Sequence, residues 1–212
     1  MSYAGPVPLK LPARIVPVTA RGEATRRKLL SAAALEFGEK GFHLASVSSI
    51  TLRAGVGQGT FYLYFRTKEE VFITLVQDIG GSLCKHTAQT LAHCTGKLAV
   101  EQASVESFID FAQRHPGSLR IVQEAQFVDE PAYRDYHASL AKIYGGALSR
   151  VSGAGGTHEA GDSDADVQAW ALTGVCHFIA MRYCLWPGQP PAPQVLAQVM
   201  RMIGAATRST LQ

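Results

Sequence analysis

The chain has 212 residues, of which 47% are hydrophobic and 17% are charged, a composition typical of a folded protein and not of a disordered one. Its most apolar stretch, residues 170–186, is interrupted by His177 and Arg182, so no membrane span is expected. The four cysteines form no Cys-x-x-Cys pair, and we predict neither a metal site nor a cofactor. Residues 1–22 contain four prolines and lack the apolar core of a signal peptide, so we expect a cytoplasmic location.

Charge is distributed unevenly along the chain, although the net charge at pH 7 is only +3. Residues 1–70 hold ten Lys and Arg against five Asp and Glu, a net charge of +5, whereas residues 71–212 carry −2. A basic N-terminal third is typical of a module that faces a polyanion such as nucleic acid. Chance variation in charge, together with a basic tail, produces the same numbers, so charge alone does not separate the two explanations.

The first predicted elements are a basic arm and three helices. Residues 1–22 form the irregular arm. Apolar residues recur on one stripe of residues 23–40, which predicts an amphipathic helix that Gly41 ends. Capping and stop signals then predict two short helices, over residues 46–54 and 57–64.

The remainder of the chain is also predicted to be helical. A long helix begins at Lys68 and continues toward residue 94, and a loop of small and acidic residues covers 152–166. No run of alternating β-branched residues predicts a sheet. We therefore predict an all-α protein of about nine helices, the later ones at 100–114, 117–128, 131–151, 165–186 and 193–210.

Residues 46–65 carry the most informative pattern, because they predict a short capped helix, a turn that contains Gly55 and a second short helix. Two helices joined by a turn of about 3–4 residues form a helix-turn-helix, whose second helix enters the major groove of DNA. We therefore predict double-stranded DNA as a partner. The residues expected to contact it are Ser46, Arg53, Gln58, Gly59, Thr60, Tyr62, Tyr64 and Lys68.

The second short helix offers side chains that suit a DNA groove. Gln58 is able to pair with an adenine edge, and the methyl group of Thr60 is able to touch thymine. Gly59 lets the backbone approach closely. The hydroxyls of Tyr62 and Tyr64 are able to donate to phosphates, while Arg53 and Lys68 add positive charge.

The aromatic residues of this helix divide into two kinds. Phe61 and Phe65 lie four residues apart on one face, and we predict that they belong to the core. Tyr62 and Tyr64 are also compatible with the core of a small helical bundle, but their hydroxyls favour a partly exposed position.

The stretches that make a known pattern are residues 33–41, 46–47, Ile50, 54–56, 59–62, 64–65 and 68–70. Together they make residues 25–76, about a quarter of the chain, resemble the DNA-binding domain of the TetR family of transcriptional regulators. The loss of the family's usual serine at Gly57 removes a side-chain N-cap, although glycine is nearly as good there. Gln58 occupies a position where the family usually has a lysine, so one positive charge is lost. Gln58 is able to contact either a phosphate or a base. The other departures are Ser49 and Thr51, where the family usually has an acidic residue and an alanine.

The resemblance implies an architecture and a mode of action. Family members are homodimers in which each chain has three N-terminal helices for DNA and about six C-terminal helices, two of which pack against the partner. A pocket in the C-terminal domain typically binds a small molecule that releases operator DNA. We therefore expect a flexible arm at 1–22, a DNA-binding domain at 23–67 and a ligand-binding and dimerisation domain at 68–212. The expected function is a repressor released from a palindromic operator by a small, hydrophobic ligand.

The C-terminal half supplies expected sites for the dimer and the ligand. Broad apolar faces on the last two helices suit a dimer interface, although an intramolecular core explains them too. The aromatics of the middle helices suit an apolar pocket and plain core equally well, and a histidine on an apolar face is more often a satisfied core residue. The expected interface residues are Trp170, Gly174, Val199, Met202 and Ile203. The expected pocket residues are Phe108, Phe111, Phe127, Tyr144, His177 and Phe178.

Two other functions are compatible with an all-α chain: a regulator without an inducer and a small enzyme. A regulator without an inducer would use its C-terminal domain to recruit a protein, and a cavity in that domain distinguishes ligand sensing from recruitment. A small all-α enzyme is the other class, but no GxSxG, HExxH or P-loop motif is present, so we predict no enzymatic activity.

Gly80 and Gly81 are expected to kink the long helix or to end it early.

Overall fold

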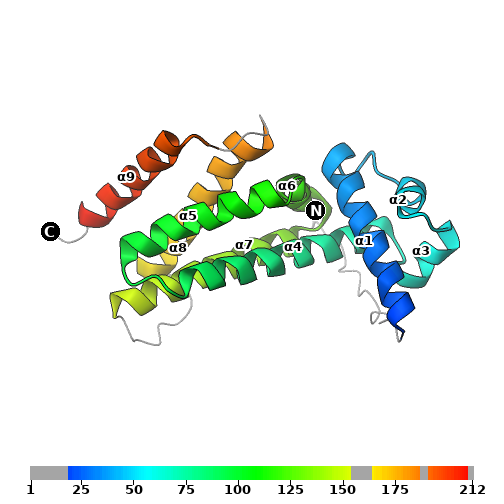
Figure 1. Cartoon of the computed structure of the whole chain (residues 1–212), viewed down its shortest axis with the longest axis horizontal. Coiled ribbons are helices and arrows are strands. Elements are labelled where there is room, and N and C mark those ends of the chain that lie inside the picture. Colours follow the sequence, from blue (N-terminus) through cyan, green and yellow to red (C-terminus); the bar gives the residue numbers. More distant parts are fainter. Residues whose placement is uncertain (1–18, 154–163, 187–190, 210–212) are drawn as a thin grey trace, which may run out of the picture.

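The computed structural model describes residues 19–153, 164–186 and 191–209, which form helices joined by short turns and contain no strand. Figure 1 shows a small head at one end of the molecule and a longer helical body beside it. The predicted all-α class is confirmed. Most of the predicted basic arm and of the loop at 152–166 lies outside the described residues. The head consists of α1 (Ala20–Lys40), α2 (Val47–Ala54) and α3 (Gln58–Tyr64).

Local signals set the bounds of the head helices. Helix α1 begins at Ala20, three residues earlier than expected. Thr19 caps it, because the Thr19 side chain accepts a hydrogen bond from the Gly22 N–H at 3.1 Å. Ser46 and Ser49 cap α2 reciprocally, each hydroxyl accepting from the other residue's backbone N–H at 3.0–3.1 Å. Gly55 adopts the left-handed conformation with φ of 66°, which turns the chain sharply from α2 into α3.

The head is held together by a small aromatic and aliphatic core. Phe61 and Phe65 are buried, as predicted, and their ring centroids lie 5.7 Å apart. Phe37 of α1 and Ile50 of α2 are also fully buried. Burying each such side chain contributes roughly 1.5–3 kcal/mol, so this core holds the three helices of the head together.

The body begins with a long helix that runs out of the head. In Figure 1, α4 (Lys68–Leu91) extends away from the head, and α5 and α7 of the body pack along it. It continues without interruption through Gly80 and Gly81, so the pair does not end the helix. A Cβ on Gly80 would lie 3.1 Å from the Tyr136 ring, which explains the glycine as a packing requirement. The body helices are α4 (Lys68–Leu91), α5 (Lys97–Arg114), α6 (Ser118–Val128), α7 (Glu130–Ser152), α8 (Asp164–Ala180), the π-helical turn η1 (Met181–Leu185) and α9 (Pro193–Ser209).

The body has a packed centre and one peripheral helix. Helices α4, α5, α7 and α8 pack against one another, whereas α9 contacts mainly α5. The helix expected over 165–186 changes to π-helical geometry at Met181, and the described part of the next helix starts at Pro193 as expected. Among the residues that the structure describes, no helix is both long and apolar enough to cross a membrane.

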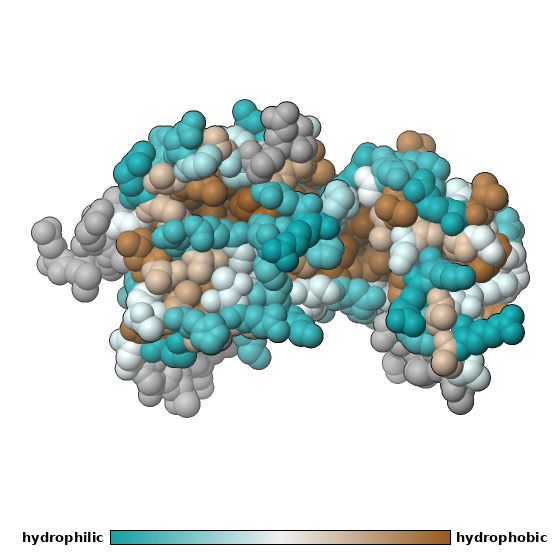
Figure 2. Space-filling model, in the orientation of Figure 1, coloured by the Kyte–Doolittle hydropathy of each residue, from teal (hydrophilic) through white to brown (hydrophobic). Residues whose placement is uncertain are grey.

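Helix α6 joins the body to the head. Figure 2 shows the head and the body as two lobes connected by a narrower waist. At the waist the backbone of Gly117 lies so close to α1 that a Cβ on it would be 2.9 Å from Gly38 Cα. Arg120 donates a hydrogen bond to the Glu39 carbonyl at 2.9 Å. The position of α6 therefore bears directly on the position of the head.

Candidate DNA interface and ligand cavity

Helix α3 presents an open surface at one end of the molecule. Gln58 and Gly59 are exposed, Thr60 is half-buried, and Tyr62 is 55% exposed. The N-cap residue Gly57 supplies no side-chain hydrogen bond to the first turn. The first turn of α3 thus lacks a capping side chain, and within it the Thr60 N–H donates to the Gly57 carbonyl at 2.9 Å.

The open surface of α3 rests on its buried face. Phe61 points inward and Tyr62 outward, with Tyr64 half-buried between the head and solvent. Since successive residues of a helix are about 100° apart, burying Phe61 turns Tyr62 toward solvent. This is the geometry that a recognition helix requires.

Two basic residues expected at the DNA have partners inside the head. The Arg53 guanidinium donates to the Glu36 carboxylate at 2.7 Å and to the Glu39 carboxylate at 2.6 Å. The Lys68 ammonium donates to the Phe42 and Ala45 carbonyls at 2.7 and 3.0 Å. The sequence pattern predicted that Arg53 and Lys68 contact DNA, because it does not show which acceptors the fold brings close to them.

The Arg53 cluster is electrostatically coupled to α1. A hydrogen bond from Lys40, together with those from Ser49 and Arg53, holds the pKa of the buried Glu36 carboxyl below its usual range. Hydrogen bonding to Arg53 also lowers the pKa of the exposed Glu39 carboxyl. Ser46, another expected DNA contact, serves as the N-cap of α2. The hydrogen bonds from Arg53 to Glu36 and Glu39 join α1 to α2.

A cavity of about 1080 Å³ lies in the body between α6, α7 and α8. Three expected pocket residues, Phe127, His177 and Phe178, line it. Phe108, Phe111 and Tyr144 do not; this corrects the expectation, because all three are buried among the core helices. The remaining lining residues are Gln123, Glu124, Gln126, Glu130, Pro131, Tyr133, Arg134, Asp135, His137, Ala138, Trp170, Thr173, Gly174 and Met181.

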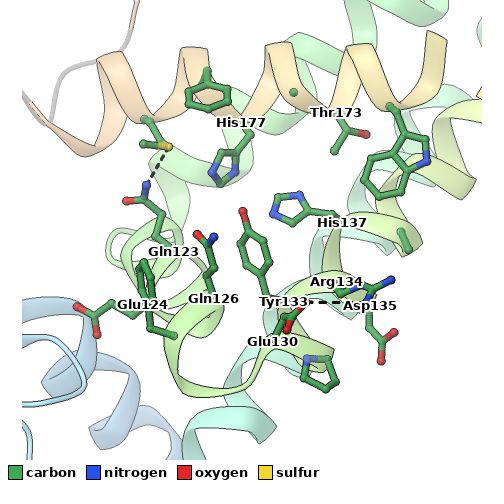
Figure 3. Close-up of a pocket in the computed structure, with 17 residues that line it drawn as sticks. Gln123, Glu124, Gln126, Glu130, Tyr133, Arg134, Asp135, His137, Thr173 and His177 are labelled. Carbon is green, nitrogen blue, oxygen red and sulfur yellow. Dashed lines mark hydrogen bonds and ion pairs between the residues drawn. The ribbon is translucent and has the colours of Figure 1, made fainter. Parts of the chain in front are cut away.

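The polar side of the cavity contains residues that the sequence did not single out. Figure 3 shows Tyr133 and His137 of α7 close to His177 of α8 at the cavity wall. Burial lowers the pKa of the His137 imidazole to about 4, with a smaller effect from His177. Burial also lowers the pKa of His177. The i, i+4 spacing of Tyr133 and His137 was the available signal, but it does not show which face of α7 borders a cavity.

Apolar residues expected at a dimer interface are distributed over α8 and α9. Trp170 is 52% exposed and Met202 is 68% exposed. Val199 and Ile203 are half-buried. Trp170 also lines the cavity, as does Gly174, where a Cβ would meet nothing within 4 Å. The expected interface and the cavity therefore share one face of α8.

An N-terminal helix-turn-helix with an exposed second helix, joined to a helical body that holds a cavity, defines a DNA-binding transcriptional regulator. Residues 29–75 match the family model described as bacterial regulatory proteins, tetR family. The domain at these residues is thus a DNA-binding domain of the TetR family of transcriptional regulators.

The sequence relatives are regulators of the same type. The chain is 29% identical over 189 residues to YdgC of Bacillus subtilis, an uncharacterized HTH-type transcriptional regulator, covering 86% of this chain and 92% of that protein. It is 32% identical over 106 residues to the HTH-type transcriptional activator FasR of Mycolicibacterium smegmatis, covering 50% of this chain and 48% of FasR.

Solved structures share the fold at low sequence identity. The fatty acid degradation regulator FadR from Bacillus halodurans superimposes with a TM-score of 0.72 at 19% identity, over 84% of this chain and 94% of that chain. FadR from Bacillus subtilis in complex with stearoyl-CoA gives a TM-score of 0.67 at 17% identity, over 84% and 96% of the two chains. These likenesses establish the architecture of head and body.

Proposed function

We propose that the protein is a repressor that a small, largely apolar ligand releases from a palindromic operator. In this proposal residues 23–67 bind DNA and residues 68–212 bind the ligand and dimerise. The base and phosphate contacts come from the open surface of the helix-turn-helix. The proposed contact residues are Ser46, Gln58, Gly59, Thr60, Tyr62 and Tyr64.

The observation that carries ligand control is the position of Glu124. It lines the cavity, and its carboxylate accepts a hydrogen bond from the backbone N–H of Phe42 in the head. Figure 3 shows the carboxylate directed toward the head, away from the histidines. A ligand that displaces α6 would therefore pull on the turn between α1 and α2. The B. subtilis FadR structure, in complex with stearoyl-CoA, supports a small-molecule effector for this architecture.

The cavity also favours ligand sensing over recruitment of a protein partner without an inducer. Its volume of about 1080 Å³ lies just above the range of roughly 300–1,000 Å³ typical of small-molecule sites. Phe127, Trp170, Phe178 and Met181 provide apolar lining. A tightly packed body would have favoured recruitment instead.

Dimerisation follows from the symmetry that operator binding requires. Two recognition helices related by a two-fold axis contact half-sites one DNA turn apart, ~34–36 Å, or a multiple of it. The exposed apolar side chains of α8 and α9 offer a self-complementary surface for this dimer. The proposed interface residues are Trp170, Gly174, Val199, Met202 and Ile203.

The test begins with selection of DNA by the purified full-length protein from a random duplex library. We expect an enriched palindrome, and none for the Tyr62→Ala protein. Transcripts adjacent to matching genomic sites should rise when the gene is deleted. A fall would instead assign the activator role that the name of FasR carries. Enrichment without a palindrome would contradict the dimer.

A further inference from the structure

The inner wall of the cavity carries a cluster of three polar rings. The centroids of the Tyr133 and His137 rings are 4.5 Å apart, and those of His137 and His177 are 5.1 Å apart. Tyr133 and His137 come from α7, whereas His177 comes from α8, so the cluster bridges two helices. Figure 3 shows the three rings converging on the same space.

Each histidine brings one buried nitrogen without a hydrogen-bond partner. His177 is 6% exposed, and no group in the described part of the chain hydrogen-bonds its Nδ1 atom. The same holds for the Nε2 atom of His137. Buried polar side-chain atoms are nearly always paired in folded proteins, so two unpaired nitrogens at a cavity wall indicate a ligand that completes them.

The two imidazoles are uncharged at neutral pH. Burial holds the pKa of both rings below the usual range, so both are neutral at pH 7. A neutral imidazole has one N–H donor and one lone-pair acceptor. The pair is therefore able to donate to a carbonyl oxygen or to accept from a hydroxyl group, without supplying a positive charge.

The charged residues around the cavity disfavour an anion. Three carboxylates, those of Glu124, Glu130 and Asp135, line it, whereas Arg134 is the single cationic lining residue among the described ones. The Arg134 guanidinium already lies 3.9 Å from Glu130. A carboxylate ligand would thus lose its hydration beside neutral rings and face a net negative lining.

We propose that His137 and His177 form the recognition site for an uncharged hydroxyl or carbonyl group on an otherwise apolar ligand. The apolar part of that ligand lies against Phe127, Trp170 and Phe178. The site selects neutral polar lipophiles over fatty-acid anions of the same length. This inference rests on the proposed role of the cavity as the effector site, and it adds the chemical class of the effector.

The test compares two probes that share one alkyl chain: 1-octanol and octanoate. Binding to the full-length protein at pH 7.5 is followed by calorimetry and by tryptophan fluorescence, because Trp170 lines the cavity. We expect 1-octanol to bind at least about fivefold more tightly than octanoate. Tighter binding of octanoate, or no binding of either probe, overturns the inference.

Variants separate recognition by the two rings from general affinity for the apolar wall. His177→Phe keeps an aromatic ring of similar size, and we expect it to lose most of the preference for 1-octanol. His137→Phe provides a second variant should the first be unstable. Phe178→Ala is the matched control and should weaken the binding of both probes by a similar factor. An unchanged preference in both histidine variants would also overturn the inference.

DNA binding provides the independent measurement. The histidine variants, without a probe, should bind the selected operator as the wild-type protein does, since the rings lie in the body and not in the head. If the wild-type protein binds no DNA, the proposed function fails. If it binds DNA but shows no preference for 1-octanol, only the assignment of the ligand class fails.

Discussion

Glu124 of α6 and Phe42 of the head are directly hydrogen-bonded, although 82 positions separate them in the sequence. The carboxylate also lies 3.5 Å from Arg120, which in turn holds the end of α1. Gly41 adopts a φ of +81°, and a Cβ there would lie 2.5 Å from the Glu124 carboxylate oxygen. Glu124 therefore accepts a hydrogen bond from the head and also lines the cavity. Its position requires a glycine at position 41.

Loss of this carboxylate should weaken the junction of head and body. We expect Glu124→Ala to lower the free energy of unfolding by about 1–3 kcal/mol, because a partly buried N–H loses a charged acceptor. Glu124→Gln retains an acceptor oxygen and should cost less. Urea unfolding measures both, with the exposed cavity residue Glu130→Ala as control. Equal effects at positions 124 and 130 would count against a special role for the junction.

The recognition helix should show two kinds of DNA contact. Tyr62→Phe removes a phosphate donor and should weaken binding to every sequence. If Gln58 contacts a base, Gln58→Ala should relax the preference at one operator position by about 1–3 kcal/mol. Gel shifts against a panel of single-base operator variants distinguish the two patterns. A uniform loss of affinity for Gln58→Ala would assign Gln58 to the DNA backbone.

Lys68 should affect stability more than the salt dependence of DNA binding. Its ammonium group donates to two carbonyls and lies 4.2 Å from the centroid of the Phe42 ring. We expect Lys68→Met to lower the free energy of unfolding by about 2 kcal/mol and to leave the salt slope unchanged. If Lys68 neutralised a phosphate, the slope would fall by about 0.9. Arg66→Met, at an exposed neighbouring position, controls for the loss of one charge.

The apolar surface of α8 and α9 should be required for dimerisation and, through it, for operator binding. Val167 and Met202 are 59% and 68% exposed. Val167→Glu and Met202→Glu place a charge on this surface and should shift the protein toward monomer at micromolar concentration. Light scattering after gel filtration measures the mass. Ala92→Glu, at the exposed end of α4, should remain a dimer; a shift there would show a nonspecific effect of the added charge.

The histidine pair should make stability depend on pH in the acidic range. The folded-state pKa of His137 is about 4, below the value of about 6.5 in the unfolded chain, so the unfolded state binds the proton first. The stabilising contribution is present above about pH 6.5 and is lost as the pH falls toward 4. Because the ring is partly open to solvent, we expect on the order of 1–2 kcal/mol. His137→Leu should reduce the difference in melting temperature between pH 7 and pH 4.5.

Helix positions were predictable because their signals are local. Ser46 with its neighbours, Gly55 and the periodic apolar stripes predicted the head helices to within about three residues. Ser49, noted as a departure from the family pattern, completes the capping box with its own hydroxyl. The helix-turn-helix lies within residues 46–65, so the class of protein followed from the sequence.

The site residues of the body were less predictable, because they depend on how distant helices meet. Periodicity identified Phe108, Phe111 and Tyr144 as apolar but did not show whether a cavity or another helix lies beside them. Tyr133 and His137 became functional candidates only when α7 and α8 were placed face to face. The sequence pattern thus shows which helix faces are apolar, but it does not distinguish a cavity wall from a packed core.

The sequence by itself determined an all-α chain with a DNA-binding head, because capping, helical periodicity and the turn chemistry of Gly55 act over a few residues. The tertiary structure decided which charges remain free and which side chains border the cavity. Arg53 and Lys68 are paired within the head because acceptors from other segments reach them. Glu124 reaches Phe42 because Gly38 and Gly117 allow α6 to approach α1 closely.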